Sequence, residues 1–147
     1  MTASSRMVLL LGLLALSGCG EEPDRIVTTE TEDGRWELTL EARKNFLRPG
    51  ESLAIRVVLE SLAGQPAATF RDTIDFIGNA GSVNPSRLTF TFIGAQDTLY
   101  SGSGVTTKFS DWITYEMSTR GSAERQGEVS ALFRDLEAVL KIRIVED

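Results

Sequence analysis

The residue types that most often perform catalysis are scarce in this chain. It has no histidine and only one cysteine, Cys19. Without histidine, Ser–His and Cys–His nucleophilic systems are excluded, and the commonest metal ligand is missing. A single cysteine cannot close an internal disulfide. We therefore expect neither histidine-dependent catalysis nor a metal site.

Paired carboxylates could still support acid–base chemistry such as glycoside hydrolysis. Asp72 and Asp75 are the closest pair outside the acidic N-terminal stretch. Their separation of three places them on opposite faces of a β-strand, which does not suit a shared site. A calcium ion could take oxygen ligands from Asp72, Asp75 or Asp97, but no EF-hand-like spacing accompanies them. We interpret these carboxylates as solvated surface groups and expect no enzyme.

Cys19 directly follows a short apolar leader. Residues 1–7 are polar and carry one positive charge, Arg6, and residues 8–16 contain no charged or strongly polar side chain. Nine residues of helix rise about 14 Å, far less than a hydrocarbon core of roughly 30 Å. This length favours a cleaved signal peptide over a transmembrane anchor.

The leader ends in Leu16-Ser17-Gly18-Cys19, which resembles the lipobox of bacterial lipoproteins at all four positions. The resemblance implies cleavage between Gly18 and Cys19, so that residues 1–18 are a lipoprotein signal peptide. It also implies a diacylglyceryl group on the Cys19 sulfur, which would anchor the chain to a membrane and leave no free thiolate. No cofactor is expected beyond this covalent lipid. The alternative is an ordinary secreted protein with a chance cysteine near its cleavage site.

Residues 19–34 form an acidic stretch that cannot bury much apolar surface. We predict a lipidated, flexible tether here, and a binding tail is the less favoured alternative. Gly20 stands where an aspartate often marks retention in the inner membrane, so the resemblance favours the outer membrane in a cell that has two. The net charge is −6 and the arginines are scattered, which argues against a nucleic-acid partner. The carboxylates of the stretch are Glu21, Glu22, Asp24, Glu30, Glu32 and Asp33.

From residue 35 onward, apolar residues recur with a period of two. Such alternation predicts strands with one buried and one solvent-facing side. Gly- and Pro-containing turns separate the runs, at residues 49–50, 64–66, 78–85, 101–104 and 121. The predicted strands lie near residues 36–43, 52–60, 73–77, 88–92, 113–117, 129–133 and 138–144, the last two joined by a turn at 134–137. About seven short strands in one domain predict an all-β, two-sheet antiparallel sandwich.

Residues 55–85 resemble the repeat unit of invasin/intimin-type bacterial Ig-like domains. The matching features are a Gly-x-Pro turn, an aromatic residue that ends a strand, and a glycine-containing turn towards a proline: Gly64, Pro66, Phe76, Gly81 and Pro85. Residues 127–131 (GEVSA) resemble the penultimate strand of that family, and an alternating strand over residues 138–145 follows. The resemblance implies a single Ig-like β-sandwich over residues 35–147.

Residues 94–111 are long for a connection within a sandwich, and long loops often carry function. The segment contains Tyr100 and Phe109, and Trp112 lies just beyond it. Exposed together, these three aromatic residues would form a binding patch. The alternative is that Phe109 and Trp112 belong to the core and that Leu99 and Tyr100 form a short strand.

Three functional hypotheses follow. The first is a membrane-anchored lipoprotein whose non-catalytic Ig-like module binds an unidentified protein or polysaccharide at the cell envelope, where "binds" rests on analogy of fold. The second is a structural or accessory subunit of an envelope complex. The third, and least favoured, is a carboxylate-dependent hydrolase.

Overall fold

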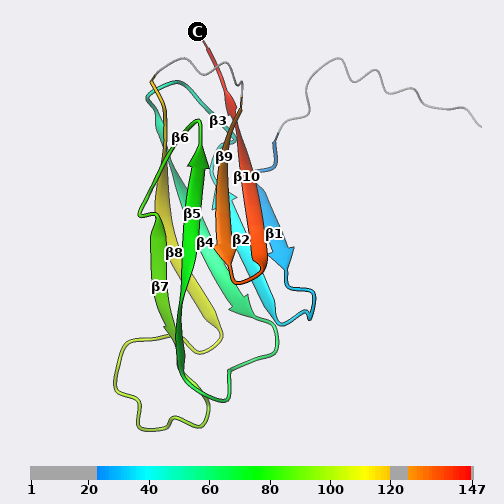
Figure 1. The fold of residues 1–147 in the computed structure, drawn as a ribbon, viewed down its shortest axis with the longest axis vertical. Helices are drawn as coiled ribbons and strands as arrows, with labels where there is room; N and C mark the ends of the chain where they lie inside the picture. The colour runs from blue at the N-terminus through cyan, green and yellow to red at the C-terminus, as the bar shows by residue number, and fades with distance from the viewer. Residues whose placement is uncertain (1–22, 120–125, 147) are drawn as a thin grey trace, which may run out of the picture.

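The computed structural model describes residues 23–119 and 126–146, and these residues form a β-sandwich (Figure 1). The predicted signal peptide, the predicted cleavage and lipidation site at Gly18 and Cys19, and the turn predicted at Gly121 lie outside the described residues. No helix in the described ranges is long and apolar enough to cross a membrane.

Ten strands are present in the described part of the chain, and no helix. In chain order they are β1 (Ile26–Glu30), β2 (Trp36–Ala42), β3 (Phe46–Leu47), β4 (Ser52–Ser61), β5 (Phe70–Asn79), β6 (Gly81–Asn84), β7 (Arg87–Phe92), β8 (Lys108–Met117), β9 (Gln126–Phe133) and β10 (Leu136–Ile144). Each of the seven predicted strands corresponds to one of them.

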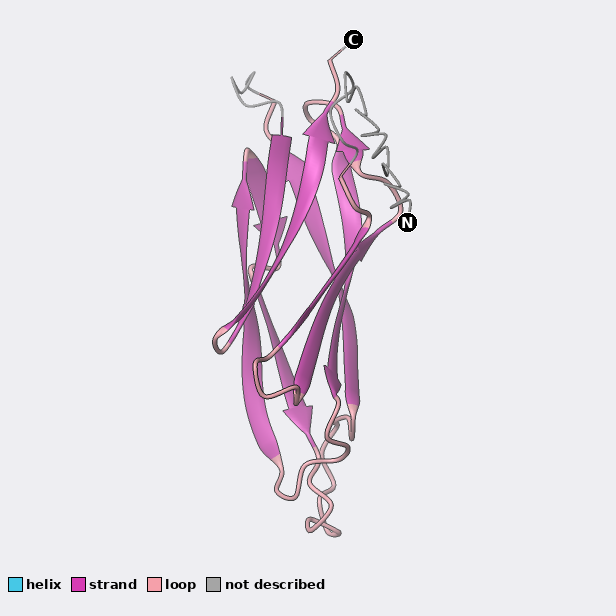
Figure 2. Ribbon diagram, turned by 90° about the vertical axis from the view of Figure 1, so that its right-hand side faces the viewer, coloured by secondary structure: helices cyan, strands magenta, loops and turns pink. Residues whose placement is uncertain are grey.

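The strands form two five-stranded sheets that face each other (Figure 2). The first sheet has the order β1-β2-β4-β8-β6, and the second has the order β3-β10-β9-β5-β7. Neighbouring strands are antiparallel except for the short parallel pair β3–β10. Without β1, β3 and β7, this is the order of the ABED and CFG sheets of an immunoglobulin-type sandwich. The predicted all-β sandwich is therefore confirmed.

The core lies between the sheets and is built from the apolar residues of the period-two pattern. Leu38, Leu40, Ile55 and Val57 are fully buried in the first sheet, while their sequence neighbours face solvent. Burial of each such side chain contributes about 1.5–3 kcal/mol, which is why the alternation fixes the inner face of each strand. Aromatic rings close one end of the core: Trp36, Phe70, Phe90, Phe92 and Phe133 make edge-to-face, stacked or tilted contacts at 5.1–5.8 Å.

Part of the predicted tether is folded. Residues 26–30, within the predicted flexible stretch 19–34, form β1 and pair with β2 in five consecutive registers. Val27 packs against the core, and the Thr28 and Thr39 hydroxyls hydrogen-bond at 3.1 Å. The Ala42 amide donates to the Arg25 carbonyl at 2.8 Å, which extends the pairing beyond the strand. Backbone pairing and one inward apolar residue are enough to order a segment that is polar in composition.

The predicted turn at residues 78–85 contains a strand. After Asn79 the chain crosses from the second sheet to the first, where β6 pairs with the end of β8. Val83 is its inward apolar residue, half-buried against the core. The crossing is tight, since a Cβ on Gly81 would lie 2.3 Å from the Glu116 carbonyl oxygen. A glycine at this position allows the close approach.

Candidate functional site

The long loop between β7 and β8 is folded onto the connection between β4 and β5. The Gly94 amide donates to the Thr69 hydroxyl at 2.9 Å, and that hydroxyl donates to the Asp97 carboxylate at 2.8 Å. A Cβ on Gly94 would lie 2.3 Å from the Ala68 carbonyl carbon. Only glycine lets the loop lie this close to the neighbouring backbone.

The returning part of the loop runs beside β7. The Val105 amide donates to the Thr91 carbonyl at 2.9 Å, and the Ile93 amide donates to the Val105 carbonyl at 2.7 Å. These bonds place residues 102–104 next to the free side of β7. A Cβ on Gly104 would be 2.9 Å from the Thr91 carbonyl oxygen, so a glycine is needed for this approach.

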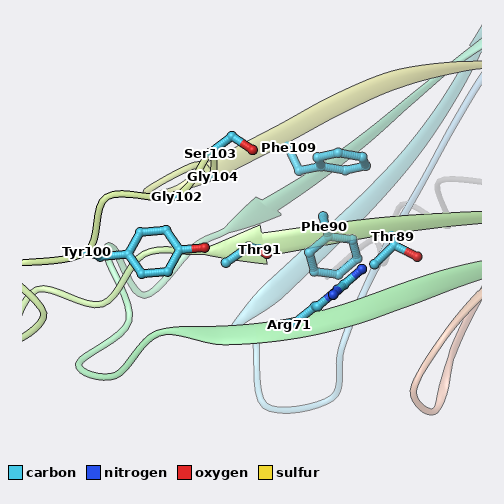
Figure 3. Close-up of a pocket in the computed structure, with 9 residues that line it drawn as sticks. All are labelled: Arg71, Thr89, Phe90, Thr91, Tyr100, Gly102, Ser103, Gly104 and Phe109. Carbon is cyan, nitrogen blue, oxygen red and sulfur yellow. The ribbon is translucent and has the colours of Figure 1, made fainter.

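A pocket of about 510 Å³ lies between this loop and the edge of the sandwich (Figure 3). Figure 3 shows Tyr100 at one end of it, with Arg71, Thr89 and two phenylalanine rings at the other. The phenylalanines are Phe90 of β7 and Phe109 of β8, whose ring centroids are 5.1 Å apart. The full lining is Arg71, Thr89, Phe90, Thr91, Tyr100, Gly102, Ser103, Gly104 and Phe109.

The lining combines aromatic surface with hydrogen-bonding groups and one positive charge. Thr89, Thr91, Ser103 and Tyr100 carry hydroxyls, and Arg71 is the one charged residue among the nine. Within the described part of the chain, Arg71 takes part in no hydrogen bond or ion pair. Its guanidinium is therefore available to a ligand with a carboxylate or another acceptor. The lining therefore offers a ligand aromatic surface, hydroxyl groups and one guanidinium.

The three predicted patch residues are not all together. Tyr100 and Phe109 line the same pocket, whereas Trp112 lies on the outer face of β8 and is 52% exposed. Residues 109 and 112 differ by three, so they point to opposite faces of the strand. The alternative interpretation placed both Phe109 and Trp112 in the core, and only Phe109, which is half-buried, packs against it. Leu99 and Tyr100 form no strand, and Leu99 is 93% exposed.

The two aspartates considered for acid–base chemistry are separated, as their spacing predicts. Asp72 accepts a hydrogen bond from Nε of Arg134 at 3.2 Å, and Asp75 is paired with Arg87. The charge and hydrogen bond of Asp75 raise the pKa of Arg87 above its usual value. The Arg134 guanidinium also lies over the Phe133 ring, 4.9 Å from its centroid. Asp72 and Asp75 are thus paired with two different arginines.

The carboxylates considered for a calcium site do not come together in the folded part of the chain. Among residues 23–119 and 126–146, no three His, Cys, Asp or Glu side chains gather closely enough to hold an ion. Asp97, considered for calcium, instead accepts the hydrogen bond from Thr69 described above.

Comparison with known proteins gives no family assignment. No protein-family model matches the chain, and no curated protein matches it significantly in sequence.

Proposed function

We propose that the protein is a membrane-anchored lipoprotein whose non-catalytic sandwich binds a protein or polysaccharide of the cell envelope. The observation that carries the binding role is the pocket, with its aromatic rings and the unpaired guanidinium of Arg71. The lipobox that ends at Cys19 supports the anchor.

The placement of the pocket suits a tethered binding module. The folded chain begins on the β1 side, at one edge of the first sheet, and the pocket lies beside β7, at one edge of the second. Contacts of β1 with β10, and of β5 with β6, put these two positions on opposite edges of the sandwich (Figure 1). A lipid on Cys19 would therefore hold the domain by one edge and leave the pocket on the other.

The free side of β7 favours a polypeptide over a polysaccharide. The Phe76 amide donates to the Ser86 carbonyl, and the β5–β7 register continues from this pair. Because hydrogen-bonded pairs alternate along an antiparallel ladder, the backbone groups of Thr89 and Thr91 point away from β5. Val105 already bonds to Thr91 from that side. An extended segment of a partner protein can add beside Thr89, with a side chain in the pocket.

Photo-crosslinking in intact cells tests this proposal. A photoreactive residue replaces Tyr100, and the control carries it at Lys141, which is exposed on the outer face of the second sheet. We expect a discrete adduct from position 100 alone. Arg71→Ala should lower its yield about tenfold, the loss expected for one hydrogen bond to a charged group.

The nature of the adduct identifies the ligand class. A protease-sensitive adduct supports the polypeptide, and a protease-resistant adduct that contains sugar supports the polysaccharide. Absence of an adduct at position 100, or the same adducts from both positions, would contradict a binding role for the pocket.

A further inference from the structure

The outer face of the first sheet carries an exposed tryptophan among positive charges. Trp112 of β8 is directly opposite Arg56 of β4, whose Nε donates to the Ser110 hydroxyl at 3.0 Å. Arg43 and Lys44, just beyond β2, line a hollow together with Trp112. We call Ile26, Arg43, Lys44, Arg56 and Trp112 the Trp112 face.

Trp112 stands between two hollows in this surface. One, of about 570 Å³, is lined by Arg43, Lys44, Ser52, Leu53, Ala54 and Trp112. The other, of about 390 Å³, is lined by Glu41, Ala42, Arg43, Arg56, Ser110 and Trp112. Three cations and one carboxylate line the two hollows together, although the whole chain carries a net charge of −6. Lys44 is already paired with Glu51, its Nζ 3.5 Å from the carboxylate, so Arg43 and Arg56 are the two cations beside Trp112 that an anionic partner could engage.

An exposed apolar residue extends this surface along the sheet. Ile26 of β1 is 57% exposed and lies opposite Glu41 of β2, which in turn lies opposite Arg56 of β4. Ile26 and Trp112 are thus in one row across four strands, roughly 14 Å apart. One acidic and one basic residue, Glu41 and Arg56, lie between the two exposed apolar side chains, and Arg43 lies beside this row.

The chain joins this face very close to Cys19. The Asn45 side-chain amide donates to the Pro23 carbonyl at 2.7 Å, and Arg25 donates to the Arg43 carbonyl at 3.5 Å. Three residues lie between Cys19 and Pro23, so the Cα atoms of these two residues are at most about 14 Å apart. A lipid on Cys19 would keep the Trp112 face near the headgroups.

We propose that the Trp112 face docks onto an anionic phospholipid surface, the membrane that holds Cys19; this rests on the proposed lipidation. Tryptophan favours the membrane interface, where its ring is buried and its N–H stays hydrated. Basic side chains next to it are attracted by anionic headgroups. Docking keeps the pocket, at the far edge and beside the second sheet, turned away from the bilayer.

The test uses the lipoprotein purified from membranes and reconstituted into vesicles of phosphatidylcholine and phosphatidylglycerol. Some lipids carry a nitroxide on the headgroup, which quenches tryptophan fluorescence at short range. Trp36 is buried in the core and serves as an internal reference, and Trp112→Phe identifies the Trp112 signal. We expect strong quenching of Trp112 that decreases when phosphatidylglycerol is omitted or salt is raised.

Charge-neutral variants show whether the basic residues cause the docking. Arg43→Gln and Arg56→Gln should each lower the ratio of docked to undocked domains about fivefold, the usual contribution of one basic residue near an anionic surface. Lys141→Gln, on the outer face of the opposite sheet, changes the net charge equally and should have no effect.

The outcomes separate this inference from the proposed lipidation. A mass spectrum without lipid on Cys19, and failure of the protein to float with vesicles, would contradict the anchor. A lipidated protein that floats but shows no selective quenching of Trp112, or equal quenching in the Arg43, Arg56 and Lys141 variants, would overturn the docking. Protection of Trp112 by an added acidic polysaccharide, with no lipid quenching, would assign the face to a saccharide instead.

Discussion

The two edges of the sandwich end in different ways. On one edge, β1 and β3 extend the sheets with short strands, and β1 is paired along its whole length. On the other edge, β6 covers only the last part of β8, and the side of β7 away from β5 has one isolated bridge among the described residues, from Phe92 to Val105. Unpaired strand edges invite further pairing. Under the proposed function, the β1 edge would carry the membrane attachment, and the β7 edge, which has the pocket, would carry the ligand.

Loss of the lipid should have the largest effect on the β1 edge. Cys19→Ala removes the sulfur that would carry the diacylglyceryl group, and one amphipathic surface cannot replace two acyl chains. We expect the protein to move entirely from the membrane fraction to the soluble fraction, as measured by fractionation and mass spectrometry. Unchanged membrane association of this variant would remove the basis for the comparison.

Next in size is a change at the base of the pocket loop. Gly94→Ala places a methyl group against the Ala68–Thr69 backbone, at 2.3–2.4 Å, and should cost about 3 kcal/mol of unfolding free energy. Gly34→Ala is the comparison variant: its φ of +66° is unfavourable for alanine, but no atom lies within 4 Å of the added Cβ, so it should cost about 1 kcal/mol. Denaturant unfolding measures both. Equal costs would show that the loop is not held against residues 66–69.

A smaller effect is expected where β6 closes the upper part of the β7 edge. The Tyr115 hydroxyl donates to the Asn79 carbonyl at 2.7 Å, in space left by Gly81 and Gly127. Tyr115→Phe should cost about 1 kcal/mol, because the part-buried hydrogen bond to the Asn79 carbonyl is lost. Chemical denaturation measures the cost. An unchanged free energy of unfolding would mean that backbone pairing alone holds β6 against β8.

The same tyrosine predicts a pH dependence. Burial raises the pKa of Tyr115 above its usual value of 10.0. The unfolded chain then releases this proton at a lower pH than the folded protein. The contribution of Tyr115 to the free energy of unfolding is therefore constant below about pH 10 and falls as the pH rises above it. Unfolding at several alkaline pH values should show a steeper decline for the native protein than for Tyr115→Phe. Identical slopes would contradict the assignment.

The smallest effect is expected within the β1 edge. Thr28 and Thr39 are exposed or half-buried and share one hydroxyl contact, so Thr28→Val should change stability by less than about 0.5 kcal/mol. Val27→Ala, which removes apolar contact with the core, should cost more. Thermal unfolding distinguishes them. A larger effect of Thr28→Val would mean that hydroxyl pairing, rather than backbone pairing and Val27, holds β1.

The sequence predicted the fold where burial imposes an alternating pattern. All seven predicted strands are found because each contributes at least two inward apolar residues, such as Leu38 and Leu40 in β2. The three missed strands carry a weaker pattern. β1 has only Val27 inward, β3 has two residues, and β6 has four residues between turn signals. These strands follow from pairing with a neighbour, which composition does not reveal.

The site was predicted in part. Loop length indicated the region of Tyr100, and the pocket contains both Tyr100 and Phe109. Strand parity separates Phe109 from Trp112 and could have been applied from the sequence, as it was for Asp72 and Asp75. Arg71 was missed because a single polar residue on the outer side of a strand has no distinctive pattern. Its place beside the loop depends on how the loop folds back.

The five-register pairing of β1 with β2 has a mechanical consequence. In Figure 1 the chain enters β1 from the upper end of the sandwich, and the loop between β7 and β8, which lines the pocket, lies at the lower end. Tension between a membrane anchor before Pro23 and a ligand in the pocket would therefore act largely along the strands, in the direction that slides β1 past β2. All five registers would then share the load at once, rather than separating one after another from the end of the ladder. A domain attached in this way would withstand a larger pulling force before β1 separates from β2.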